Sequence, residues 1–306
     1  MFSILLFVHH FIFFGLDRAR IHEDSFLQSK AEGAQLKYTW RELEPEKGRY
    51  DFSAIRKDLA FLEANQKKLF VQLQDVSFDA WIVNVPEYLK ADPQYEYGEG
   101  QEDKARVAGW VARRWDPATR EQFHLLLDAL GKEFDGRIAG INLPETAVEF
   151  GESGKHFPSG FTFENYRDGI LDNMAALKRA FPKSVAMQYA NFMPGEWLPS
   201  MNNHYLESVY DSAQKLGVSP AGPDLFPWKK GQMNHSYKLL HDWTGNVPPG
   251  IAVQEGNYAY VNPKTGKRIT TKELLSFATD YLHAGYIFWF AEAPYYQRDV
   301  LPLVNR

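Results

Sequence analysis

The stretch Ile138-Ala-Gly-Ile-Asn-Leu-Pro-Glu145 is an apolar run that ends in an acidic residue, and Gly250-Ile-Ala-Val-Gln-Glu255 follows the same pattern. The two glutamates are 110 residues apart. Three units of an apolar run followed by an amphipathic segment fill that interval, at about 37 residues each, a length typical of a strand and its helix. In a barrel of eight such units, Glu145 would follow strand 4 and Glu255 would follow strand 7.

The same alternation continues toward both ends of the chain. It predicts strands at residues 8–15, 34–40, 68–74, 138–143, 184–189, 219–225, 250–254 and 286–290. It predicts helices at residues 24–30, 53–65, 164–181, 203–216 and 231–243, with two more that begin at the capping boxes Thr119/Gln122 and Thr270/Glu273. Gly217 is a natural C-terminal residue for the helix at 203–216.

This alternation favours a parallel sheet, because each parallel crossover needs a helix. We therefore expect an α/β fold of the (β/α)8 TIM barrel type. An open doubly wound sheet is the competing architecture, but it usually has a glycine-rich phosphate loop after strand 1, and Phe14-Gly15-Leu16-Asp17 is not such a loop. No linker or repeat divides the 306 residues, which predicts one domain over 1–306. The irregular stretch at 76–117 is long enough to line a site.

Composition excludes several classes of function. The net charge is −5, so the chain lacks the excess of lysine and arginine that is typical of a nucleic-acid binder. The absence of cysteine excludes disulfides and metal sites with thiolate ligands. No H-E-x-x-H, G-x-S-x-G or P-loop motif occurs, so we expect no metal and no cofactor. The pair His9-His10 has no metal-ligand partner at a recognisable spacing, which favours packed strand histidines.

The apolar run at residues 4–14 superficially resembles a signal peptide. No lysine or arginine precedes it, a histidine pair interrupts it, and no small-residue cleavage site follows. The run is also too short to span a bilayer, and we expect no membrane partner. We interpret it as the buried first strand, with a leader as the alternative. Compartment and oligomeric state stay open.

The segment Tyr38-Thr-Trp-Arg-Glu-Leu-Glu-Pro-Glu-Lys-Gly-Arg-Tyr-Asp-Phe52 is the most distinctive of the chain. It resembles the strand-2 motif W-x-x-L-E-P-x-x-G-x-Y-D-F of the clan A glycoside hydrolases. Physically the motif is mainly structural: Glu44-Pro45 turns the chain, and Phe52 packs at the start of the next helix.

In that clan, a glutamate after strand 4 is the general acid/base and one after strand 7 is the nucleophile. The resemblance implies these roles for Glu145 and Glu255. The clan usually has an asparagine directly before the strand-4 glutamate, whereas Pro144 stands there in this chain. Asn142 is then the candidate to contact the sugar 2-hydroxyl, and Glu149 is a rival acid. The clan's strand-8 tryptophan matches Trp289, which would form the floor beneath the sugar.

Two carboxyls about 5–5.5 Å apart can break a glycosidic bond with retention of configuration. Other polar and aromatic residues at strand ends are candidates to bind the substrate. The predicted substrate-binding set is Trp40, Arg41, Asp75, Asn142, Asn191, Asp224, Asn257 and Trp289, with Gln74 and Glu292 as further polar candidates and Phe78, Trp81, Trp228 and Tyr258 as further aromatic ones.

The resemblance therefore implies a retaining glycoside hydrolase that acts on a β-linked oligo- or polysaccharide. A carbohydrate-binding barrel that has lost catalysis is a second hypothesis, and the unusual Pro144 favours it. A barrel lyase or isomerase using the same carboxylates is a third, although it would normally need a metal or phosphate site.

Overall fold

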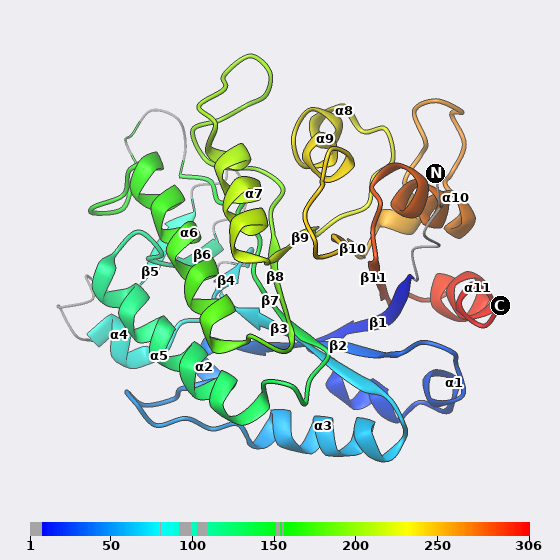
Figure 1. The fold of residues 1–306 in the computed structure, drawn as a ribbon, viewed down its shortest axis with the longest axis horizontal. Helices are drawn as coiled ribbons and strands as arrows, with labels where there is room; N and C mark the ends of the chain where they lie inside the picture. The colour runs from blue at the N-terminus through cyan, green and yellow to red at the C-terminus, as the bar shows by residue number, and fades with distance from the viewer. Residues whose placement is uncertain (1–7, 80, 92–98, 103–108, 151–153, 155) are drawn as a thin grey trace.

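A computed structural model describes residues 8–79, 81–91, 99–102, 109–150, 154 and 156–306. Eight parallel strands close into a barrel in the order β1-β11-β10-β9-β8-β7-β3-β2 (Figure 1). Their bounds are β1 His9–Gly15, β2 Gly33–Thr39, β3 Lys68–Gln74, β7 Gly140–Leu143, β8 Val185–Tyr189, β9 Ser219–Gly222, β10 Gly250–Val253 and β11 Tyr286–Phe290. The predicted (β/α)8 barrel is confirmed.

The first strand closes the ring. β1 pairs with β2 on one side and with β11 on the other, where His10 is the partner of Ile287. The interpretation of this segment as strand 1 is confirmed from His9 onward, while residues 1–7 lie outside the described part of the chain.

Helices surround the barrel, and α5, α6 and α7 lie side by side along one flank of it (Figure 1). The α-helices are α1 Asp24–Leu27, α2 Trp40–Leu43, α3 Ser53–Ala64, α4 Glu87–Ala91, α5 Pro117–Phe134, α6 Phe163–Ala180, α7 Tyr205–Leu216, α8 Lys230–Asn234, α9 Ser236–His241, α10 Thr271–Ser276 and α11 Leu301–Val304. Short 3-10 turns lie at Arg18–His22 and Asn257–Ala259, and π-helical turns at Phe277–Tyr281 and Tyr296–Val300. No helix in the described ranges is both long and apolar enough to cross a bilayer.

The capping predictions had different outcomes. Thr270 and Glu273 form the predicted capping box of α10. The box at Thr119 and Gln122 is wrong, because α5 begins earlier and the side chain of Asp116 accepts the hydrogen bond from the Thr119 amide. Gly217 ends α7 as predicted, with a left-handed φ of 71°.

The helix predicted at 231–243 is divided into α8 and α9. The break lies at His235, whose ring Nδ1 donates to the Gly231 carbonyl at 2.7 Å and whose Nε2 accepts from the Leu198 amide at 2.9 Å. A histidine that satisfies backbone groups from two segments gives no periodic signal in the sequence, which explains why the break was missed.

The described part of the stretch at 76–117 contains more regular structure than its composition indicates. β4 Val76–Ser77, β6 Gly109–Ala112 and β5 Glu99–Glu102 form a small antiparallel sheet beside the carboxyl end of β3. This sheet places the segment next to the strand ends where barrel chemistry occurs.

Alternate strand residues fill the barrel interior, as the period of two requires. The buried interior cluster is Phe11, Phe13, Phe70, Met187, Tyr189, Ala221, Ala252 and Phe288. Above this apolar layer, the Gln35 amide donates to Asn142 at 3.0 Å and to the Tyr189 hydroxyl at 2.8 Å. The interior thus becomes polar toward the carboxyl ends of the strands.

The strand-2 motif has the structural role that was predicted. Glu44 is fully buried, and its carboxylate accepts hydrogen bonds from Trp40 Nε1 at 2.8 Å, from the Gly48 amide at 2.9 Å and from Gln122. Phe52 is buried at the start of α3 and packs edge-to-face on Phe134. The carboxylate therefore holds the turn after β2 and cannot reach a ligand.

Candidate active site

A cavity of about 390 Å³ opens at the carboxyl ends of the barrel strands. Glu145 and Glu255 both line it, together with a third carboxylate, Asp224. Its other lining residues are Leu16, Lys37, Thr39, Gln72, Gln74, Val76, Ser77, Phe78, Ile82, Asn84, Tyr189, Pro223 and Gln254. The structure thus brings the two predicted catalytic glutamates, from the ends of β7 and β10, to one polar pocket.

Glu145 is partly buried and fixed by its neighbours. Its carboxylate accepts a hydrogen bond from Asn191 Nδ2 at 2.7 Å, and its backbone carbonyl accepts one from Arg114 at 2.9 Å. The Gln188 amide donates to the carbonyl of Pro144 at 2.7 Å. Asn191 follows β8, so the predicted substrate ligand Asn191 lies against the acid itself.

Arg114 is a site residue that the sequence analysis missed. Its guanidinium makes a buried two-point ion pair with Asp75, with nitrogen–oxygen distances of 2.5 and 2.9 Å, and also donates to the Tyr166 hydroxyl at 2.8 Å. Since the same guanidinium holds the Glu145 carbonyl, Arg114 links the ends of β3 and β7. It lies in the irregular stretch at 76–117, where no periodicity singled it out.

Asp224 follows β9 and reaches the pocket from the side of Glu255. Burial raises the pKa of the Asp224 carboxyl, while a hydrogen bond from Asn257 Nδ2 at 3.4 Å and the charge of Lys229 oppose that rise. Glu255 itself is exposed. The pocket therefore contains an acid with a raised pKa that the resemblance alone did not imply.

Lys37 is a second residue that was missed. It lies on β2, in the barrel interior, with its ammonium 5.3 Å from the centre of the Phe13 ring. Burial lowers the pKa of the Lys37 ammonium, and the negative charge of Glu145 acts in the opposite direction. Its position two residues after the buried Gln35, on the same face of the strand, is the signal that could have identified it.

Trp289 and Trp40 do not line the pocket, so both predictions are wrong. Trp289 has no exposed surface and packs in the layer between strands and helices, where its Nε1 donates to His10 Nδ1 at 3.1 Å. Phe288 is the inward residue of β11, so strand alternation turns Trp289 outward. Trp40 is fully buried, and its Nε1 donates a hydrogen bond to the Glu44 carboxylate.

Three residues that were predicted to bind the substrate are instead buried and hydrogen-bonded to other protein groups, so these predictions are wrong. Asn142 has no exposed surface and bonds to Gln35 and to the Leu143 carbonyl. Asn257 is also fully buried, and its Oδ1 accepts from the Leu225 and Gln254 amides. Asp75 is 2% exposed in its ion pair with Arg114.

The other candidates differ in their position relative to the pocket. Arg41 is outside its lining and donates to the Val85 carbonyl and to Glu87. Gln74 and Phe78 line the pocket. Glu292 accepts from the Gly256 amide at 2.9 Å, and Glu149 lines a neighbouring pocket. Within the described ranges, no three histidine or acidic side chains are grouped as metal ligands.

No protein family profile and no curated protein matches the chain. Several solved structures, however, are similar to the chain in fold. Xylanase 10B from Thermotoga petrophila RKU-1, in complex with xylobiose, matches with a TM-score of 0.54 at 12% identity, over 93% of this chain and 83% of that one. GH5_18 from Streptomyces cattleya, in complex with GlcNAc, matches with a TM-score of 0.57 at 12% identity, over 92% and 70%.

Endo-glycoceramidase II from Rhodococcus sp. matches with a TM-score of 0.52 at 11% identity, over 94% of this chain and 73% of that one. At these identities the likeness concerns the fold. The resemblance indicated by the strand-2 motif is confirmed at that level: the chain has the eightfold barrel fold of the clan A glycoside hydrolases.

Proposed function

We propose that the protein is a retaining glycoside hydrolase that cleaves a β-linked oligo- or polysaccharide. One observation carries the proposal: Glu145 and Glu255, from two different strands, line one pocket at the carboxyl end of a closed barrel. A pair of carboxylates at that end of the barrel is the equipment that glycosidic bond cleavage requires.

In the proposed mechanism, Glu145 gives its proton to the glycosidic oxygen while the Glu255 carboxylate attacks the anomeric carbon. The bond to the leaving group breaks, and a glycosyl ester of Glu255 forms. Glu145, now ionised, then takes a proton from water, whose oxygen attacks the anomeric carbon and releases Glu255. Asn191, at 2.7 Å from the Glu145 carboxylate, would keep the acid oriented in both steps.

The pocket also offers groups suited to sugar hydroxyls. The Oε1 atoms of Gln72 and Gln74 are buried and have no hydrogen-bond partner among the described residues. The Lys37 ammonium can donate to the same hydroxyls, and the partly exposed ring of Phe78 offers an apolar face for the sugar's CH groups. A mixed polar and aromatic lining of this kind supports a carbohydrate substrate.

Anomeric proton NMR during digestion of β-glucans, galactans, xylans and mannans tests the proposal. We expect the β-anomer to appear first. Glu145→Gln should lower turnover of unactivated substrates by about 10²–10⁴-fold and leave binding intact. Glu255→Gln should abolish turnover, and azide should restore it with inverted configuration. An α-anomer appearing first would exclude the double displacement.

A second candidate function is a carbohydrate-binding barrel without catalysis, and one observation favours it. Ala252 is an inward residue of β10, so alternation gives the next inward position to Gln254 rather than to the exposed Glu255. An amide cannot serve as a nucleophile here. In this case the wild-type protein would bind glycans with no turnover, and Gln254→Glu would be the substitution with which to look for a gain of hydrolysis.

A further inference from the structure

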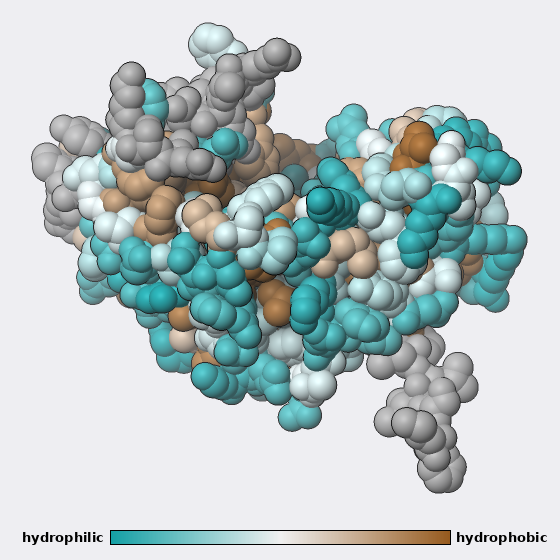
Figure 2. Space-filling model, turned by 90° about the horizontal axis from the view of Figure 1, so that it is seen from above, coloured by the Kyte–Doolittle hydropathy of each residue, from teal (hydrophilic) through white to brown (hydrophobic). Residues whose placement is uncertain are grey.

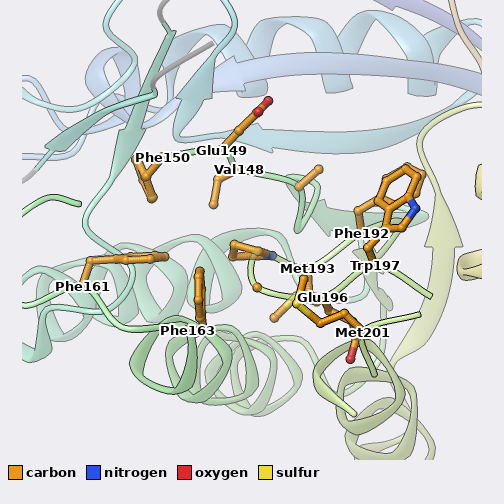
Figure 3. A pocket seen from close by; sticks show the side chains of 13 residues that line it. Val148, Glu149, Phe150, Phe161, Phe163, Phe192, Met193, Glu196, Trp197 and Met201 are labelled. Atoms are coloured by element: carbon orange, nitrogen blue, oxygen red, sulfur yellow. The ribbon is translucent and has the colours of Figure 1, made fainter. Parts of the chain in front are cut away.

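A second cavity, of about 490 Å³, lies beside the proposed active site. Its walls are mostly apolar. Figure 3 shows Val148 and Phe150 on one side, Phe161 and Phe163 opposite them, and Trp197 at the far end. Hydrophobic residues also gather in the hollow between two lobes of the face seen in Figure 2, whereas hydrophilic residues cover most of the rest.

The second cavity is lined by residues that closely follow the proposed acid and its partner Asn191 in the chain. Ala147, two residues after Glu145, and Phe192, next to Asn191, both line it. The two loops are joined by a hydrogen bond of 2.7 Å from the Thr146 hydroxyl to the Phe192 carbonyl. Because a general acid protonates the oxygen of the leaving group, the leaving group lies on the acid's side of the broken bond. This second cavity is therefore on the leaving-group side.

Two large apolar side chains of this cavity are left in contact with solvent. Trp197 is 55% exposed and Met201 is 40% exposed. The Trp197 ring stacks on Phe192, with centroids 5.9 Å apart and an interplanar angle of 9°. Such apolar surface in a concave site is typical of a ligand pocket.

The two carboxylates among the lining residues do not make the cavity polar. The Glu196 carboxylate accepts hydrogen bonds from the Asn203, Tyr205 and Leu206 amides at the start of α7. The Glu149 carboxylate points away from the rings (Figure 3). Among the described residues, no lysine or arginine lines the cavity. The cavity thus has few polar groups to pair with the hydroxyls of a second sugar, whereas an apolar group fits the lining.

We propose that this cavity binds an apolar aglycone, an alkyl chain or aromatic ring carried by the leaving group of a β-glycoside. The assignment to the leaving-group side depends on the proposed function. The substrate class then becomes glycosides with a sugar in the polar pocket and an apolar aglycone beside Phe150, Phe163 and Trp197.

Titration calorimetry with the Glu145→Gln variant tests the inference without requiring turnover. The probes are methyl, butyl and hexyl β-glycosides of glucose, galactose, xylose and mannose, used below micelle-forming concentrations. We expect the affinity to rise by roughly fourfold for each methylene that is fully buried. From methyl to hexyl, the gain should reach at least about tenfold in one sugar series.

Adding Trp197→Ala, or Met201→Gln as a second and independent change, should remove most of that gain. Leu125→Ala, at an exposed apolar residue of α5 outside the cavity, should leave it intact. No gain from methyl to hexyl in any series would overturn the inference, as would a gain that neither cavity variant reduces. Glycan hydrolysis without the alkyl gain would leave the proposed function standing. The alkyl gain without any hydrolysis by wild type would instead reject the hydrolase.

Discussion

The candidate site contains a partly buried lysine whose positive charge is unfavourable for folding. Lys37 is on an inward position of β2, and burial lowers the pKa of its ammonium. A lysine whose pKa is lowered on folding destabilises the protein while it is protonated, and this cost disappears as pH rises through the folded pKa toward the unfolded value of 10.5. Residues kept at such a cost are typical of functional sites.

Lys37→Met should therefore raise the free energy of unfolding, by about 1 kcal/mol at neutral pH, and impair substrate binding. Denaturant titrations between pH 6 and 10 would measure this. The advantage of the variant should shrink as pH rises, because wild-type Lys37 then becomes neutral. Lys57→Met, on the exposed face of α3, is the matched control. An equal effect of both substitutions at every pH would contradict the argument.

Sequence reasoning identified acids at this scale better than aromatic platforms. Glu145, Glu255 and Asp224 could be predicted because each follows an apolar run, and the end of a barrel strand opens on the site. Trp289 could not be assigned correctly. The inward or outward direction of a side chain changes with every residue, so an uncertainty of one position in a strand end reverses it.

The connection between β3 and β7 is the critical feature at the level of elements. Asp75 at the end of β3 and Arg114 before α5 form an ion pair in which the side chains are 2% and 3% exposed. The same arginine holds the carbonyl of Glu145. Elements far apart in sequence thereby set the position of the proposed acid.

Asp75→Ala should destabilise the protein by about 3–5 kcal/mol, because it leaves the Arg114 cation buried without its anion. Thermal unfolding followed by circular dichroism would measure the loss. Asp172→Ala, which removes the partly exposed ion pair with Arg120, should cost less than about 1 kcal/mol. Similar losses in the two variants would show that the buried pair does not support the end of β7.

The sequence was informative about elements with a strong period and weak elsewhere. The helices at 53–65, 164–181 and 203–216 were found within a few residues because one face of each is buried. All eight strands were found because each is a short apolar run that is buried on both faces. The antiparallel sheet of β4, β5 and β6 was missed, since its strands are short and β4 pairs with β6, which is distant in sequence.

For the molecule as a whole, the closed ring predicts a single cooperative unit over 1–306. Every barrel strand has two neighbours, so no subset of strands has a complete core of its own. Unfolding by denaturant should therefore give coincident transitions by far-ultraviolet circular dichroism and by tryptophan fluorescence. Two separated transitions would indicate two domains.

The pairing of β1 with β11, which closes the barrel, also has a consequence for folding during synthesis. His10 and Trp289, which are hydrogen-bonded across β1 and β11, are 279 positions apart in the chain. On a ribosome, β1 emerges long before the strand that completes it, and one edge of an apolar strand stays open to other chains during that time. Pairing of β11 with β1 therefore closes the barrel only after the other seven strands have been made, and the open edge of β1 depends on shielding until then.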